Sequence, residues 1–226
     1  MSPLGLASFA PPRWTLLVMS HARWEYLGRT LKALDDVVGL DFFARRILSL
    51  DADLAPQDGP GGVSWEVAAT GGRHGLIANL QQGWDQLGDD EWVFHLEEDF
   101  LVNDAPLDAM RQVLEANPSV AQMVLERQPA NPSEWANGSL VGVDNIPTFE
   151  QWGNPDASWR EQRHLFSFNP CVYHSSIATK AGVERDVTAR LRADGRTFGF
   201  WGAQGDAPRC EHIGIEGGMG SAGWRA

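Results

Sequence analysis

The sequence is poor in cysteine and in basic residues. Only Cys171 and Cys210 occur among 226 residues, and no CxxC or Cys/His zinc pattern accompanies them. They could pair, but no spacing requires it, so a reduced, cytoplasmic setting is expected. Lysine and arginine number 18 against 30 acidic residues, giving a formal net charge of −12. This balance disfavours a broad polyanion-binding surface, although it permits a local basic groove.

Long apolar runs are also absent. No run approaches the roughly 18 residues that a membrane span needs. Residues 1–12 lack the basic start and apolar core of a signal peptide. By contrast, hydrophobic residues make up 43% of the chain, and ten of its residues are tryptophan. The chain can therefore form a sizeable core, as one large α/β domain or two small ones.

Hydrophobic periodicity predicts that strands and helices alternate through most of the chain. Continuous apolar runs indicate buried strands, and apolar residues three or four apart indicate helices. Ser20 suits a helix cap, and Pro106 suits the first turn of a later helix. This order predicts a mostly parallel sheet with helices on both faces. The expected strands are 14–19, 47–50, 63–68, 92–100, 120–125 and 171–173, and the expected helices are 24–34, 76–87, 104–115 and 184–192.

The segment Trp92–Phe100 leads an apolar strand into three carboxylates, Glu97, Glu98 and Asp99. Charged side chains seldom lie in such a run unless they are paired or bind a metal. Open α/β sheets bind ligands at the carboxyl ends of their strands. Mg²⁺ and Mn²⁺ prefer oxygen ligands of this kind. The segment therefore indicates a metal-dependent enzyme acting on a phosphorylated substrate, with an acidic turn that caps a strand as the structural alternative.

Four blocks occur in order along the chain: Leu16–Arg23 with Tyr26, Leu27, Thr30 and Leu31, Gly72–Leu76 with Asn79, Phe94–Asp99, and Glu184–Leu191 with Gly195 and Phe198. Together they resemble a GT-A glycosyltransferase of the family-2 type. The similarity is fair from about residue 14 to 102 and patchy beyond. It implies an α/β fold of GT-A type, with a Rossmann-like, mostly parallel sheet and an irregular acceptor-side region. It also implies one domain over 1–226, with a nucleotide-sugar-binding half at 14–102 and an acceptor-side half with a flexible tail at 103–226.

The resemblance also assigns a divalent cation, Mn²⁺ or Mg²⁺, to the acidic strand end. In that family the motif is Asp-x-Asp, and its cation neutralises the leaving nucleoside diphosphate. Asp99 is then the main metal ligand, Glu97 a second ligand or a nucleotide contact, and His212 a remote third ligand. Strand alternation would place Glu97 and Asp99 on one face and Glu98 on the other. The expected contacts to a donor, a UDP-sugar above all, are Ser20, His21, Arg23, Asp51, Asp53, Arg73, Glu97 and Glu98.

The fourth block implies the catalytic base. Inverting transfer needs a carboxylate that deprotonates the acceptor hydroxyl. By motif position this is Glu184, where the family usually has Asp, with Asp186 second. Capping of the helix N-terminus is the alternative role for both.

The acceptor is expected at the irregular stretch from Arg127 to Phe168. Arg160, Arg163 and His164 form one local basic cluster there, and ordinary surface is the alternative reading. Trp224 in the Gly-rich tail could belong to a lid over bound donor or to a frayed terminus. The expected acceptor-binding residues are Trp135, Trp152, Trp159, Arg160 and Arg163.

The leading hypothesis is a metal-dependent, inverting glycosyltransferase that uses a nucleotide-sugar donor. Its acceptor is a small molecule, a glycan or a hydroxylated base of phage DNA, and the net charge argues mildly against DNA. A nucleotidyltransferase is the alternative enzyme, but it would need a Gly-rich basic loop that Ser20–Arg23 lacks. A non-catalytic carbohydrate-binding protein would explain the tryptophans and leave the acidic strand end unexplained.

Overall fold

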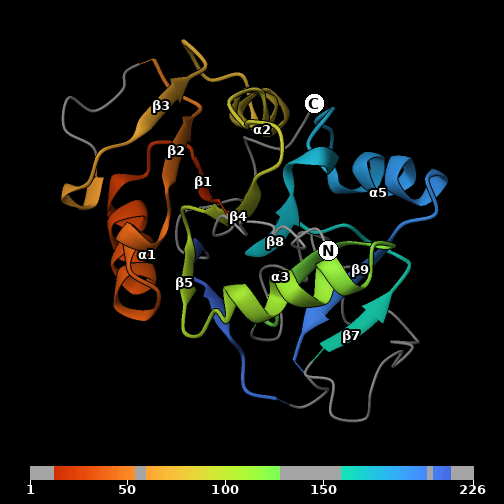
Figure 1. Ribbon diagram of the computed structural model, residues 1–226. Helices are drawn as coiled ribbons and strands as arrows, with labels where there is room; N and C mark the ends of the chain where they lie inside the picture. The colour runs from red at the N-terminus through yellow and green to blue at the C-terminus, as the bar shows by residue number, and fades with distance from the viewer. Residues whose placement is uncertain (1–12, 54–59, 128–158, 203–205, 215–226) are drawn as a thin grey trace, which may run out of the picture.

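A twisted eight-stranded sheet lies at the centre of the protein (Figure 1). The computed structural model describes residues 13–53, 60–127, 159–202 and 206–214. In order across the sheet, the strands are β3 (Glu66–Ala69), β2 (Arg45–Leu50), β1 (Trp14–Ser20), β4 (Trp92–Glu97), β8 (Cys171–His174), β6 (Val120–Leu125), β9 (Thr197–Trp201) and β7 (Trp159–Gln162). The first four strands are parallel, as are β6 and β9. β8 and β7 run antiparallel to their neighbours, so the sheet is mostly parallel, as the sequence predicts.

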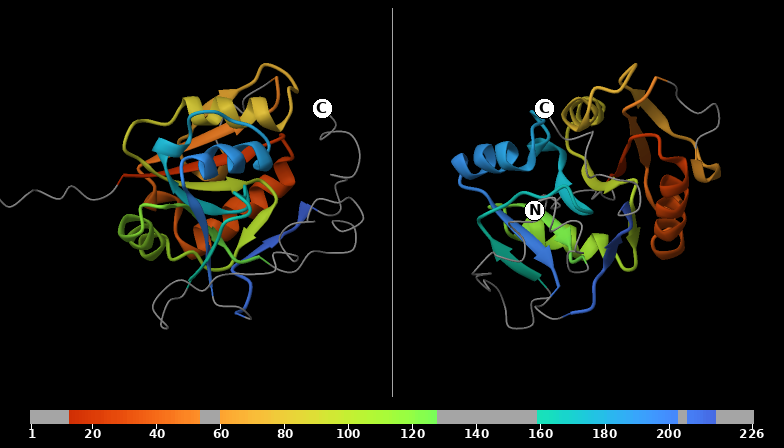
Figure 2. Two further views of the ribbon diagram at one scale, coloured as in Figure 1. Left: turned by 90° about the vertical axis from the view of Figure 1, so that its right-hand side faces the viewer. Right: turned by 180° about the vertical axis from the view of Figure 1, so that it is seen from behind.

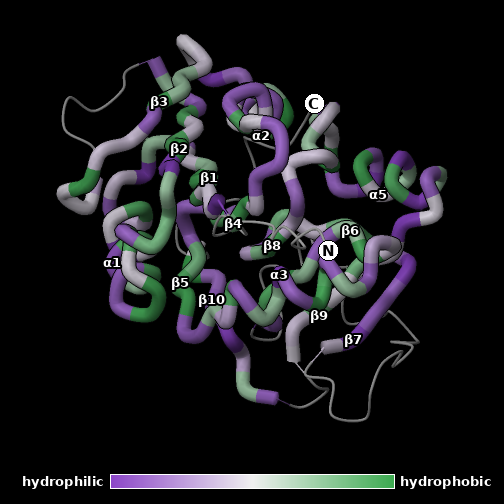
Figure 3. Tube along the Cα trace, in the orientation of Figure 1, coloured by the Kyte–Doolittle hydropathy of each residue, from purple (hydrophilic) through white to green (hydrophobic). Residues whose placement is uncertain are grey.

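Helices cover both faces of the sheet in the described part of the chain (Figure 2). The helices are α1 (Trp24–Val37) and α3 (Leu107–Ala116) on one face, and α2 (Leu76–Asp85) and α5 (Glu184–Ala193) on the other. Hydrophobic and hydrophilic stretches alternate along α1 and α5 in Figure 3, the pattern of helices with one buried face. On α1 the buried residues are Leu27, Thr30, Leu31 and Leu34. None of the described helices is long and apolar enough to cross a membrane.

Short elements complete the structure, and several of them differ from the sequence-based expectation. Ser20 does not cap α1, because that helix starts only at Trp24. β3 starts at Glu66, because the preceding chain forms a short turn in which the Trp65 indole donates to the Pro60 carbonyl. The remaining short elements are η1 (Leu40–Phe42), η2 (Pro60–Gly62), η3 (Ser175–Ile177), β5 (Phe100–Val102) and β10 (Cys210–His212).

Tertiary pairing defines β7 and β10, and the sequence-based expectation omits these two strands and β9. β7 falls in the stretch expected to be irregular, and its sequence Trp-Arg-Glu-Gln carries no apolar alternation. It is a strand because it pairs with β9 in antiparallel register. β10 likewise pairs with β5 in a separate two-stranded sheet. This second pairing matters for function, because it returns the end of the described chain to the carboxyl end of β4.

Replacing Leu34 by alanine tests how α1 is held to the sheet. Leu34 is fully buried in the core, so Leu34→Ala is expected to lower the free energy of unfolding by about 3 kcal/mol. Val37 lies on the same helix with 41% of its surface exposed, so Val37→Ala is the matched control, with a change within about 0.5 kcal/mol. Urea unfolding of both variants gives the comparison, and equal losses would contradict this packing of α1.

Candidate functional site

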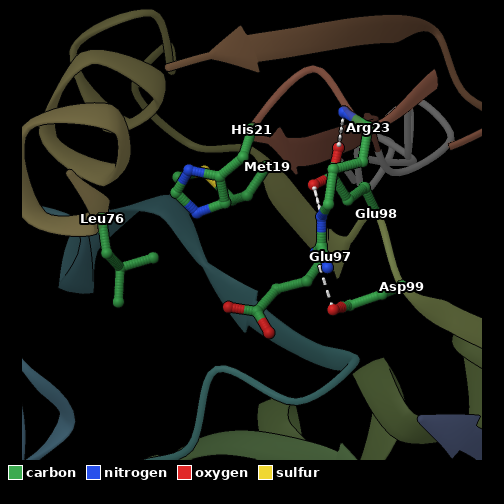
Figure 4. Close-up of a pocket in the computed structure, with 7 residues that line it drawn as sticks. All are labelled: Met19, His21, Arg23, Leu76, Glu97, Glu98 and Asp99. Carbon is green, nitrogen blue, oxygen red and sulfur yellow. Dashed lines mark hydrogen bonds and ion pairs between the residues drawn. The ribbon is translucent and has the colours of Figure 1, made fainter. Parts of the chain in front are cut away.

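An acidic pocket opens at the carboxyl ends of β1 and β4 (Figure 4). The two strands are parallel neighbours, with Met19 opposite Glu97, so both deliver their last residues to the same edge of the sheet. This is the edge at which open α/β sheets bind ligands. The lining residues are Met19, His21, Arg23, Leu76, Glu97, Glu98 and Asp99.

A larger cavity, of about 200 Å³, lies at the opposite edge of the sheet, near the first residues of β4 and β6. Its polar side chains already have partners within the protein. His174 contacts Asp90 and Ser176, and Arg196 donates to the Pro118 carbonyl. The acidic pocket, in contrast, contains a carboxylate without a partner in the described structure, and it is the stronger candidate for chemistry.

Glu98 is buried and fully engaged in hydrogen bonds. One of its carboxylate oxygens accepts from the Ser20 hydroxyl and, at 3.1 Å, from the Arg23 backbone N–H. The other oxygen accepts from Arg23 Nε at 2.5 Å. The Thr30 hydroxyl donates to the Glu98 carbonyl at 2.6 Å. The Glu98 carboxylate therefore binds the turn that leads into α1, and it is directed at Ser20 and Arg23.

Asp99 is also buried, and two cationic or polar groups converge on its carboxylate. Arg23 Nη2 donates to Oδ2 at 2.7 Å, and His212 Nε2 lies 3.3 Å from the same oxygen. Burial alone would raise the pKa of Asp99, but the contacts with His212 and Arg23 outweigh it and lower the pKa. Asp99 is therefore held as a carboxylate.

The approach of His212 to Asp99 depends on β10. In the β5–β10 pair, His212 is opposite Phe100, and the two rings lie 4.8 Å apart. The chain then turns back over Asp99, because the Ile213 N–H donates to the Asp99 carbonyl at 2.8 Å. A Cβ added at Gly214 would collide with Asp99 Oδ2 and crowd His212. Gly214 is thus a site residue that the sequence-based analysis missed, and its place two residues after His212 was the available signal.

Glu97 differs from the two carboxylates that follow it. It is partly exposed, points into the pocket away from Arg23 (Figure 4), and makes no hydrogen bond or ion pair in the described structure. Burial raises its pKa well above the usual glutamate value, and the negative charges of Asp99 and Glu184 raise it further. Glu97 is therefore the carboxylate that is free to meet a ligand.

The first turn of α5 places its two acidic residues in different surroundings. Glu184 Oε1 accepts from the Phe168 backbone N–H at 2.8 Å. Burial raises the pKa of Glu184, although hydrogen bonds from Phe168 and Ser167 partly oppose the rise. Asp186 is exposed, and its carboxylate lies 3.7 Å from Arg185 Nε. The structure thus brings Glu184 within electrostatic range of Glu97 and leaves Asp186 at the surface.

Asp51, expected to read the nucleotide base, instead organises the loop before α2. It is buried and accepts from the backbone N–H groups of His74 at 2.6 Å and Gly75 at 3.1 Å, and His21 Nδ1 lies 3.2 Å away. Burial opposes ionisation, but these contacts outweigh it and lower the pKa of Asp51. Of this pair, only His21 lines the pocket.

Several other expected site residues lie outside the pocket. Asp53 and Arg73 are exposed, without an ion pair in the described ranges. Arg160 is only 4% exposed, pairs with Glu126 and donates to the Gly202 carbonyl, so the expected basic surface cluster with Arg163 and His164 does not form. Trp159 is buried in β7. Trp135, Trp152 and Trp224 lie outside the described residues.

The donor atoms at Asp99 and His212 fit a divalent cation in type. Among the described residues, no three His, Cys, Asp or Glu side chains are grouped as a metal site, and Glu97 does not join this pair. Asp99 Oδ2 and His212 Nε2 nevertheless converge at 3.3 Å. A carboxylate oxygen with an imidazole nitrogen suits Mn²⁺ better than Mg²⁺, which favours oxygen ligands. The pair thus offers two donor atoms of the kind that a divalent cation binds.

Solved structures identify the fold. No protein-family model matches the sequence, and no curated protein is significantly similar to it. The crystal structure of GalNAc-T7 with UDP, GalNAc and Mn²⁺ matches at 12% identity and a TM-score of 0.61, over 93% of this chain and 45% of that one. A UDP-glucose pyrophosphorylase from Acinetobacter baumanii matches at 12% identity and a TM-score of 0.54, over 90% and 89% of the two chains.

These matches establish that the chain has a GT-A-like fold, as the sequence predicts. The chain spans less than half the length of the GalNAc-T7 chain that it matches. The first neighbour was crystallised with UDP and the second is named for UDP-glucose, and their common feature with this chain is the fold.

Removing the charge of Glu98 tests whether it holds the turn between β1 and α1. Glu98→Gln is expected to lower the free energy of unfolding by about 2 kcal/mol, because a buried carboxylate with charged and neutral donors is lost. Glu211 is an exposed glutamate on β10, so Glu211→Gln is the control and should change the free energy of unfolding by less than about 0.5 kcal/mol. Urea unfolding at neutral pH compares the two variants with the wild type. An unchanged free energy of unfolding in Glu98→Gln would contradict this role.

Proposed function

We propose that this chain is a glycosyltransferase that moves a sugar from a nucleoside diphosphate donor, a UDP-sugar, to an acceptor hydroxyl. The observation that carries the proposal is the convergence of Asp99 and His212 at the carboxyl edge of a GT-A-like fold. These residues are 113 positions apart, and a separate two-stranded sheet brings them together. The free Glu97 carboxylate beside them supports a site that meets a ligand rather than a purely structural ion pair.

On the donor side, Asp99 and His212 would hold a divalent cation, with Mn²⁺ preferred. When bound, this cation would neutralise the diphosphate that leaves as the glycosidic bond breaks. His21 lies at the pocket with its Nδ1 directed to Asp51, which leaves Nε2 for the nucleotide. Arg73 is exposed on the loop before α2 and offers a guanidinium for phosphate. Residues 14–102 form the donor half in this proposal.

On the acceptor side, Glu184 would act as the base of an inverting transfer. Its raised pKa increases its affinity for a proton, which suits a group that must take one from a hydroxyl. The exposed Asp186 is less suited, because it lies at the surface beside Arg185. Residues 103–226 form the acceptor half, and a small molecule or glycan is the favoured acceptor. The burial of Arg160 and the net charge of −12 disfavour DNA.

A nucleotidyltransferase is the second candidate function, because the pyrophosphorylase matches over 89% of its own length. Such an enzyme would make a UDP-sugar and pyrophosphate from UTP and a sugar 1-phosphate. The turn Ser20–Arg23 contains no glycine, which disfavours it. Product analysis separates the two functions, since a glycosyltransferase releases UDP from a UDP-sugar and does not consume UTP.

Donor binding is tested by thermal shift with UDP, UDP-glucose and UDP-GalNAc. Mn²⁺ with the correct nucleotide at about 100 times its Kd should stabilise the wild-type protein by about 2.7 kcal/mol. EDTA or Asp99→Asn should abolish this shift, because the cation loses its protein ligand. Asp36→Asn, at an exposed aspartate of α1, should retain it. The absence of a shift with every nucleotide would contradict the donor site.

The base is tested by following UDP release from the donor that binds. Glu184→Gln should slow it by about 10²- to 10⁴-fold while the UDP-dependent thermal shift remains. Because burial raises the pKa of Glu184, the wild-type rate should fall as pH decreases through a value above that of an exposed glutamate. Asp194→Asn, at the exposed end of α5, is the control. If the rate of UDP release by Glu184→Gln still falls in the same way as pH decreases, Glu184 is not the group responsible for that fall.

A further inference from the structure

Arg23 occupies an unusual position for a residue expected to contact the donor. Its Nε is 2.5 Å from Glu98, and its Nη2 is 2.7 Å from Asp99. Both carboxylates are at least 98% buried, whereas a quarter of the Arg23 side chain is exposed. The guanidinium therefore bridges two of the three carboxylates in the acidic strand end. It supplies the positive charge that two adjacent buried carboxylates require.

The two ends of this bridge are not equivalent. At Glu98, the backbone N–H and Nε of Arg23 both donate, and the Ser20 hydroxyl donates as well. At Asp99, a single Nη2 contact reaches Oδ2, the same oxygen that faces His212. Nη1 makes no hydrogen bond in the described structure. The Asp99 contact is thus the one that can be exchanged while the Glu98 contacts remain.

A divalent cation at Asp99 and His212 would lie close to this guanidinium. Like charges a few ångströms apart repel strongly in a buried site, because water screens them poorly. A diphosphate changes the balance, since a guanidinium pairs with phosphate oxygens in two-pronged geometry. If the Nη2 hydrogen bond moved from Asp99 to a phosphate oxygen, Asp99 Oδ2 would be free to bind the metal ion. The phosphate would then place negative charge between the guanidinium and the divalent cation.

We propose that Arg23 is a resident counter-ion that keeps a divalent cation weakly bound at Asp99 until a nucleoside diphosphate withdraws the guanidinium. Arg23 is then a positioning residue that couples two ligands: the diphosphate strengthens cation binding, and the cation strengthens diphosphate binding by the same factor. This inference rests on the proposed function, because it takes the Asp99–His212 pair as the cation site. Free Mn²⁺ alone binds weakly, which prevents a charged site from filling without its donor.

Mn²⁺ titration, followed by the electron paramagnetic resonance signal of the free ion, measures this coupling directly. In the wild type, UDP should lower the Kd for Mn²⁺ by about tenfold or more. Arg23→Gln should bind Mn²⁺ alone about tenfold more tightly than the wild type, because the competing charge is gone. UDP should then change its Mn²⁺ affinity less. Arg29→Gln is the matched control, since Arg29 is exposed on α1, the helix that follows Arg23, without an ion pair in the described structure. This variant should behave as the wild type.

Arg23→Lys guards against a folding defect in Arg23→Gln. An ammonium group keeps a charge beside Glu98, but it cannot bridge both carboxylates as a guanidinium does. Arg23→Lys should therefore fold, as judged by its unfolding transition, and should also bind Mn²⁺ alone more tightly than the wild type. Equal Mn²⁺ affinity of the wild type and both Arg23 variants would overturn the inference.

The Mn²⁺-alone titrations need no donor, so they separate failure of the inference from failure of the proposed function. Equal affinities together with a UDP-dependent thermal shift would remove the counter-ion role and leave the donor site intact. Absence of Mn²⁺ binding in every variant, with or without UDP, would overturn the cation site and the counter-ion role together. A gain of Mn²⁺ affinity in Arg23→Gln without any nucleotide binding would support the competition between Arg23 and the cation, but it would overturn the coupling to a diphosphate and the glycosyltransferase.

Discussion

Two adjacent carboxylates buried at the end of β4 impose the constraint around which this site is built. Glu98 and Asp99 cannot remain ionised in the interior without donors and positive charge. The Arg23 guanidinium satisfies both, and it thereby ties the turn after β1 to the turn after β4. The start of α1, the edge of the pocket and the orientation of Asp99 all follow from this contact.

The three consecutive carboxylates show how strongly environment separates residues of like chemistry. Glu98 is a structural acceptor at the start of α1, Asp99 is held between Arg23 and His212, and Glu97 is left without a partner in the described structure. The role of Glu98 comes from packing around the turn before α1. The surroundings of Asp99 depend on the pairing of β10 with β5, far along the chain. Only Glu97 presents a free carboxylate to a ligand.

The fold does not identify the reaction. The same α/β arrangement is found in a glycosyltransferase and in a pyrophosphorylase, each 12% identical to this chain, so an argument about function has to come from the site. Here the turn after β1 brings an arginine to the acidic strand end, and α5 brings Glu184 near Glu97. The carboxylates of Glu97 and Glu184 thus influence each other beside the Asp99–His212 pair, and it is this arrangement on which the proposed sugar transfer rests.

Local pattern in the sequence was sufficient for the parallel β–α framework, for both helix layers and for the burial of charge at the acidic strand end, because apolar periodicity and charges within an apolar run are local signals. It failed for β7 and β10, which exist only through pairing with partners remote in sequence. It likewise misplaced Arg160, whose buried partner Glu126 is 34 residues away. Which carboxylate binds arginine, which meets histidine and which stays free was decided by tertiary structure alone, because adjacent residues of like chemistry differ only in what the distant chain brings to them.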